Sequence, residues 1–131
     1  MNETATHLRS TINTALPLLR SIPHATVRLD PYPPKWSKIQ VLGHLVDSAC
    51  NNHMKFTLAM AQPHTRVIGY AQNHWVDAQH YQDGDWNELV ELWYAYNRHL
   101  AHVIARASPE TLSHTLTIAG RRIRSCRRYP F

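Results

Sequence analysis

The stretch Ser37–Met60, SKIQVLGHLVDSACNNHMKFTLAM, decides the fold. At about 100° per residue its apolar side chains gather on one face, which predicts an amphipathic helix. Ser37 followed by Gln40 has the pattern of a capping box, and Pro63 lies just beyond the last apolar position. We therefore expect a helix from Ser37 to near Gln62. Its predicted core-facing residues are Ile39, Leu42, Leu45, Val46, Ala49, His53, Phe56 and Met60.

Two further amphipathic helices are predicted, one on each side of this stretch. In the first, apolar residues recur every three or four positions from Leu8 to Ile22, and Pro17 is expected to kink or break it. The second begins at Asp85, with Glu88 completing another capping-box pattern, and continues to Ala107.

The segments between these helices have no sustained period. Pro63–Gly84 is rich in aromatic and amide side chains, and we expect a long loop with a short helical turn at Trp75–His80. Thr115–Ile118 is β-branched and suits a short extended piece. Loops as long as Pro63–Gly84 in a small domain are usually functional or disordered, and the aromatic content favours the first.

Three amphipathic helices, the first two joined by a proline-rich connector at Leu29–Pro34, predict an all-α helical bundle. Three apolar faces need a fourth partner, and the residues after Gly120 do not supply one. The expected organisation is a helical domain at 1–120 followed by a basic tail at 121–131.

Length and composition limit the class of protein. The 131 residues suit one domain, and no apolar run approaches the about 20 residues that span a bilayer. No stretch near Met1 resembles the apolar region of a signal peptide. Cys50 and Cys126 are too few for a secreted domain of this size, so we expect a cytoplasmic protein without a membrane partner.

The net charge of +5 is concentrated at one end of the chain. Of the 14 lysines and arginines, five lie after Gly120, which leaves nine basic against nine acidic residues in the rest. A basic binding face on the domain is therefore not expected, and nucleic acid is an unlikely partner. Binding through the arginine-rich tail is the remaining route.

Ten histidines are an excess, and His44 is the most interesting of them. It falls on the polar face of its helix with Ser48, Asn51 and Lys55, and Asp47 is one turn away. This face is either an ordinary solvated surface or a polar cleft in which Asp47, Ser48 or Asn51 orients His44.

The other histidines on helices have simpler interpretations. His53 falls on the apolar face, where a hydrogen-bonded core histidine is expected. His99 and His102 have a spacing that can chelate a metal, but His102 points well away from the apolar face. We therefore do not expect them to share a metal.

The run Trp36-Ser37-x-x-Gln40-x-Leu42-Gly43-His44-Leu45-Val46-Asp47-Ser48 resembles the second-helix signature of the DinB-like superfamily. The resemblance extends over Leu8–Ile118 and includes the looser pattern Tyr70-x-Gln72-x-x-Trp75-Val76-x-x-Gln79-x-Tyr81. It implies a four-helix bundle, a homodimer, and a zinc or nickel ion held on three histidines. Members include bacillithiol-dependent transferases and hydrolases, so a low-molecular-weight thiol is an implied partner.

The resemblance also assigns roles. His44 corresponds to the metal ligand of the second helix, Asp47 and Asn51 are candidates to support it, and Gln72, Trp75 and Tyr81 are candidates to shape the pocket. In the family the other two ligands come from a histidine pair on the fourth helix. After Gly120 this chain has no histidine, so the implied metal site is incomplete.

Two functions from different classes follow. The favoured one is a DinB-like protein derived from metal-dependent transferases or hydrolases, with weak or absent activity in this chain and catalytic residues that the sequence does not identify. The alternative is a non-catalytic interaction protein. Its three helices would leave an apolar groove for dimerisation or for a partner helix.

Overall fold

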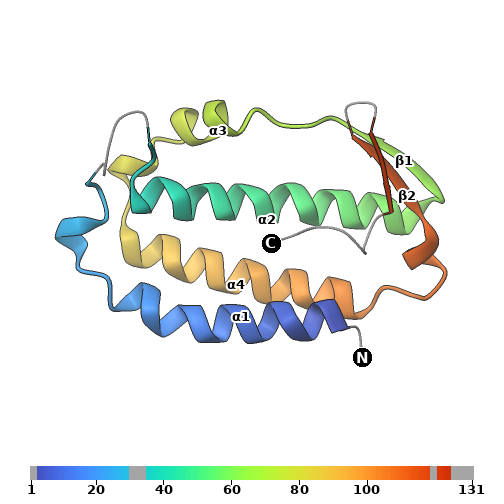
Figure 1. The fold of residues 1–131 in the computed structure, drawn as a ribbon, viewed down its shortest axis with the longest axis horizontal. Helices are drawn as coiled ribbons and strands as arrows, with labels where there is room; N and C mark the ends of the chain where they lie inside the picture. The colour runs from blue at the N-terminus through green and yellow to red at the C-terminus, as the bar shows by residue number, and fades with distance from the viewer. Residues whose placement is uncertain (1–2, 30–34, 119–120, 125–131) are drawn as a thin grey trace.

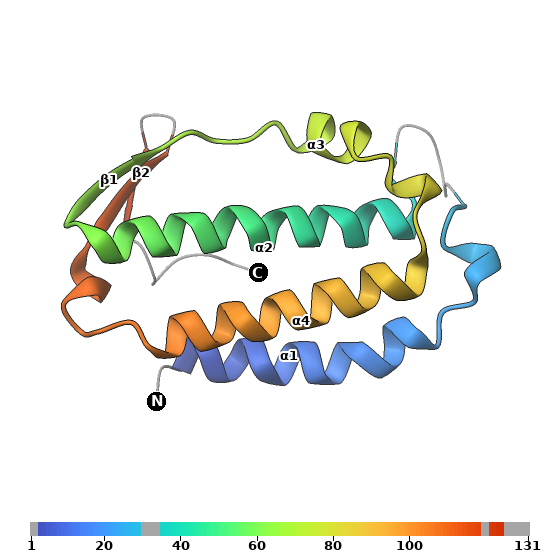
Figure 2. The ribbon, with the colours of Figure 1, turned by 180° about the vertical axis from the view of Figure 1, so that it is seen from behind.

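Three long helices lie side by side with α4 in the middle (Figure 1). The computed structural model describes residues 3–29 and 35–118 and the backbone of residues 121–124. Helix α1 spans Glu3–Arg20, α2 spans Lys38–Ala61 and α4 spans Trp86–Ala105. Helix α4 packs against both α1 and α2. Helices α2 and α4 run in the same direction and α1 runs in the opposite one, as Figure 2 also shows.

Because α2 and α4 are parallel, the chain must travel back along α2 before α4 begins. This return segment, residues 68–84, carries the short helix α3 (Gln72–Ala78) and the 3-10 turn η2 (Tyr81–Asp83). It follows the outer side of α2 in both views. The predicted loop with a helical turn is therefore largely confirmed, although the helix begins three residues earlier than expected.

The predicted helix starts are confirmed by their caps. The Ser37 N–H donates to Gln40 Oε1 at 2.9 Å, and Asp85 Oδ1 accepts from the Glu88 N–H at 2.9 Å. Helix α2 ends at Ala61, close to the expected boundary. Helix α1 continues through Pro17 to Arg20, so of the kink or break expected at that proline the break is wrong. Pro17 lies in the last turn, so only three residues continue the helix after it.

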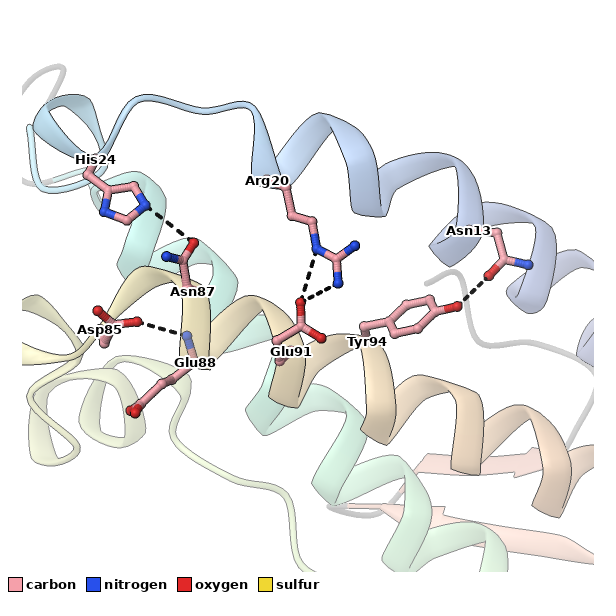
Figure 3. Close-up of polar contacts among 8 residues, drawn as sticks. All are labelled: Asn13, Arg20, His24, Asp85, Asn87, Glu88, Glu91 and Tyr94. Carbon is pink, nitrogen blue, oxygen red and sulfur yellow. Dashed lines mark hydrogen bonds and ion pairs between the residues drawn. The ribbon is translucent and has the colours of Figure 1, made fainter.

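The core lies between α4 and its two neighbours. Trp86 is buried, and its indole N–H donates to the Leu19 carbonyl at 3.1 Å. Polar pairs line the edge of the α1–α4 interface, among them Arg20–Glu91 and Tyr94–Asn13 (Figure 3). Leu45, which the helical wheel placed in the core, is 41% exposed. Other members of the core cluster are Leu8, Ile12, Val27, Ile39, Leu42, Phe56, Val90, Trp93, Leu100 and Ile104.

A three-stranded sheet closes one end of the molecule, so the domain is mostly helical, whereas the sequence predicted an all-α bundle with one short extended piece. Strand β1 (His64–Val67) pairs in parallel with β2 (Thr115–Ile118), and β2 pairs in antiparallel with β3 (Arg121–Arg124). The extended piece expected at Thr115–Ile118 is thus β2. Val67, Leu116 and Ala59 form a second, smaller core under this sheet.

Two expectations concern residues after Gly120: the missing fourth helix and the basic tail at 121–131, of which residues 125–131 lie outside the described residues. The absence of a fourth long helix there lies mostly outside the described residues, of which only Arg121–Arg124 follow Gly120, and these form β3. Within the described part of the chain the α-helices are α1, α2, the short α3 and α4, with 3-10 turns at His24–Thr26, Tyr81–Asp83 and Thr111–Ser113. None of these helices is long and apolar enough to cross a membrane.

Candidate functional site on helix α2

The polar face of α2 is buried beneath the return segment. Asp47, Asn51 and Lys55 are only 2%, 5% and 6% exposed. For these three residues the ordinary solvated surface is therefore wrong, and they form an interior polar layer. His44 and Ser48 are half-buried at its edge, next to the exposed Val41 and Leu45.

Asp47 is the centre of this layer. Its Oδ1 accepts hydrogen bonds from the Tyr81 hydroxyl at 2.6 Å and from Gln79 Nε2 at 2.7 Å. Burial raises the pKa of Tyr81, and the hydrogen bond to Asp47 raises it further, so the phenol stays protonated as a donor. The two bonds tie the end of the return segment to α2.

Gly43 allows this contact. A Cβ atom at position 43 would overlap the ring of Tyr81, which lies directly against the helix backbone. The return segment is also held at Ser37, whose Oγ donates to Gln82 Oε1 at 3.1 Å. The glycine in the Gly43-His44 pair therefore serves the close approach of Tyr81.

Two buried polar atoms on α2 lack a hydrogen-bond partner among the described residues: Nδ1 of His44 and Oδ2 of Asp47. An unsatisfied buried polar atom costs about 1–3 kcal/mol, so such atoms in a folded protein call for a partner. The two residues are three positions apart, which places them on the same side of the helix. The His44 ring packs against Trp36, with 5.0 Å between the ring centres.

Tyr70 and Lys55 extend the layer towards the middle of α2. The Lys55 ammonium lies 5.9 Å from the centre of the Tyr70 ring. Burial lowers the pKa of Lys55 and raises the pKa of Tyr70, which the charge of Asp47 raises further. Asn51 donates from Nδ2 to the Asp47 main-chain oxygen at 2.9 Å, so its amide is engaged with its own helix.

The structure brings together only some of the residues that the sequence singled out. Tyr81 contacts Asp47, and Gln72, although exposed at the start of α3, forms a side-chain hydrogen bond with Tyr70. Trp75 packs edge-on against Tyr70, with ring centres 5.2 Å apart, and lines a small pocket of about 280 Å³. The role of Gln79 was missed, although its position two residues before Tyr81 in the quoted pattern was a usable signal.

Trp36 was also missed as a neighbour of His44. Besides contacting that ring, it lines a pocket of about 490 Å³ between the end of α1 and the start of α2. The other lining side chains are mostly apolar: Leu19, Ile22, Leu29, Val41, Leu42, Leu45 and Trp86, with Lys38. An apolar pocket thus adjoins the polar layer at Trp36.

No group of three metal-binding side chains (His, Cys, Asp or Glu) comes together in the part of the chain that the structure describes. His53 Nδ1 lies 3.3 Å from the Tyr96 hydroxyl, in keeping with the expected hydrogen-bonded role. His99 and His102 stack with 6.3 Å between ring centres and complete no such group.

Comparison with known proteins places the chain in a family. Residues 7–128 match the model of the DinB superfamily. The chain belongs to the DinB superfamily. Among solved structures, this DinB protein is similar to YfiT from Bacillus subtilis, which is described as a probable metal-dependent hydrolase with an unusual four-helix bundle topology. The TM-score is 0.81, and the match covers 94% of this chain and 72% of that chain.

The sequence identity to YfiT is 13%, so this likeness concerns the fold. None of the curated proteins compared with the chain matches its sequence.

Proposed function

We propose that this DinB protein binds a divalent metal, zinc or nickel, weakly through His44, and that any hydrolase or transferase activity of the chain alone is weak or absent. The observation that carries the proposal is the buried Nδ1 of His44, which has no partner among the described residues. An imidazole nitrogen is a ligand that suits both zinc and nickel. Family membership supports the same role for this histidine.

The available donors fit only part of a metal site. Asp47 Oδ2 is the second free donor, and the bonds from Tyr81 and Gln79 to Oδ1 hold its carboxylate in place. Catalytic zinc sites have three protein ligands and an open position. The described residues offer no set of three, so we derive no reaction step through the metal.

Calorimetric titration with zinc and nickel chlorides tests the assignment. We expect weak binding, with a dissociation constant in the micromolar range or weaker, that is lost in His44→Ala. His7→Ala removes an exposed imidazole from α1 and should leave the titration unchanged. Tight metal binding that persists in His44→Ala would contradict the assignment of His44 as a metal ligand. Tight binding that depends on His44 would show a complete ligand set and overturn the weak-site proposal.

A second function is favoured by the apolar pocket, namely self-association through the surface around it. Leu29, Val41 and Leu45 line this pocket and are 61%, 43% and 41% exposed. A second copy is the occupant we propose, because a twofold interface is self-complementary and residues 1–120 carry no net formal charge to repel a copy.

Light scattering over a range of protein concentrations tests this. We expect a dimer that Leu45→Glu converts to a monomer, whereas Leu92→Glu, on an exposed site of α4, leaves it intact. A wild-type protein that stays monomeric throughout would rule the interface out. A low-molecular-weight thiol as a further partner stays a prediction from the family resemblance.

A further inference from the structure

A third pocket lies on the surface between α1 and α4, and it is rich in nitrogen donors. Its volume is about 640 Å³, and its lining is mainly polar. Helix α1 contributes Arg9 and Asn13, and α4 contributes Tyr94, Arg98, His99 and His102. These residues play no part in the proposed function of His44.

The positive charge of this pocket has no acidic partner in its lining. Helices α1 and α4 contain three carboxylates in all, Glu3, Glu88 and Glu91. Glu91 is the one nearest in sequence to the pocket residues of α4, and its Oε1 is bound by Arg20 at 2.6 Å (Figure 3). The two arginines of the pocket therefore form a local positive centre on a domain with no net formal charge.

The side chains are held in an arrangement that suits an acceptor-rich ligand. The Tyr94 hydroxyl donates to Asn13 Oδ1 at 3.0 Å, which turns the Asn13 amide nitrogen away from that bond and leaves it as a donor. The Arg98 guanidinium lies 5.6 Å from the centre of the Tyr94 ring. The rings of His99 and His102 stack nearly parallel, with an angle of 22° between their planes.

We propose that this pocket binds a phosphate-bearing small molecule through Arg9, Arg98 and the two histidines. Arginine presents its donors in a planar fork that matches phosphate oxygens, and a phosphate group supplies several strong acceptors for one pocket. The histidines form no group of three metal-binding side chains in the described part of the chain, so a phosphate fits the donor set better than a cation does.

Calorimetric titration with inorganic pyrophosphate tests the proposal on the full chain. We expect Arg98→Gln, and more so Arg9→Gln with Arg98→Gln, to weaken binding about tenfold or more, because each charged hydrogen bond contributes strongly. Arg66→Gln is the matched control, since it removes the same charge from an exposed site on β1. Amide chemical shifts measured by NMR during the titration should move in α1 and α4.

Removal of the two histidines gives an independent measurement. His99 and His102 line the pocket with Arg9, Arg98 and Tyr94, and the ring centre of His53 from α2 lies 5.1 Å from that of His99. His99→Gln with His102→Gln should weaken pyrophosphate binding at a fixed pH.

Three results would overturn the proposal. One is an equal loss of affinity in Arg66→Gln, which would indicate general attraction to a positive protein. Another is the absence of pyrophosphate binding by the folded wild-type chain. The third is binding of a short single-stranded DNA by the same residues without pyrophosphate binding, which would assign the surface to nucleic acid.

Discussion

At the scale of single residues, Gly43 occupies a position where any side chain would clash. Glycine inside a helix ordinarily costs about 1 kcal/mol relative to alanine. Here the residue is buried, and a Cβ would overlap the Tyr81 ring, which its hydroxyl bond to Asp47 keeps in place. The helix accepts a poor helix former because the return segment crosses it at this point.

Gly43→Ala should therefore destabilise the protein by about 1–3 kcal/mol, the cost of forcing an extra methyl group into a packed site. In a Tyr81→Ala background the ring is gone, and the same substitution should stabilise the helix by up to about 1 kcal/mol. Urea unfolding of the four proteins measures both values. A stabilising effect of Gly43→Ala in the wild-type background would show that Tyr81 does not lie on the helix.

Tyr81 gives a prediction with a pH dependence. Its pKa is raised in the folded protein, so its stabilising effect is complete below the ordinary tyrosine pKa of about 10 and disappears as the pH rises through the folded-state value. Tyr81→Phe should cost about 1–3 kcal/mol at pH about 8, because it leaves Asp47 Oδ1 with one bond fewer. This cost should shrink above pH about 10. Unfolding measurements in which it stays constant to higher pH would contradict the Tyr81–Asp47 bond.

At the scale of elements, the α1–α4 interface combines two kinds of contact that contribute very different amounts to the stability of the fold. Arg20 and Glu91 form a visible ion pair, but both side chains are more than half exposed (Figure 3). Exposed pairs of this kind contribute about 0–1 kcal/mol. Ile12 and Trp86 belong to the hydrophobic core and are 1% and 2% exposed.

Ile12→Ala should accordingly destabilise the protein by about 2–5 kcal/mol, whereas Arg20→Ala should cost less than about 1 kcal/mol. Chemical denaturation of both variants, with and without added salt, checks the comparison. Salt should reduce the effect of Arg20→Ala and leave that of Ile12→Ala nearly unchanged. An Arg20→Ala effect as large as that of Ile12→Ala would mean that the ion pair, and not the core, holds α1 in place.

At the scale of the whole molecule, α4 is the helix on which the others depend. It packs on both α1 and α2, whereas α1 packs mainly on α4. Local opening is easiest where an element has the fewest partners. Amide exchange should therefore be faster in the middle of α1 than in the middle of α4. Mass spectrometry of exchanged peptides measures this, and stronger protection of α1 than of α4 would contradict the arrangement of the helices.

The three long helices were predictable from sequence because their apolar periods and the caps at Ser37 and Asp85 are local signals. Strand β1 could not be predicted, because residues 64–67 form a strand only by pairing with residues 115–118, which are distant in sequence. The same limit applied to the site. The helical wheel placed His44 on a polar face with Asn51 and Lys55, and Asp47 one turn away. The burial of Asp47, Asn51 and Lys55 depends on the return segment, which has no periodic signal of its own.

The parallel pairing of β1 with β2 affects the order in which the chain can fold during synthesis on the ribosome. Residues 64–67 are made well before 115–118, and α4 is synthesised between them. Until β2 emerges, the edge of β1 offers unpaired backbone groups to any neighbouring chain. The helical layer can assemble in the meantime, but this sheet must wait, as pairings between distant segments do. The sheet end is thus where a stalled nascent chain would be most exposed to aggregation.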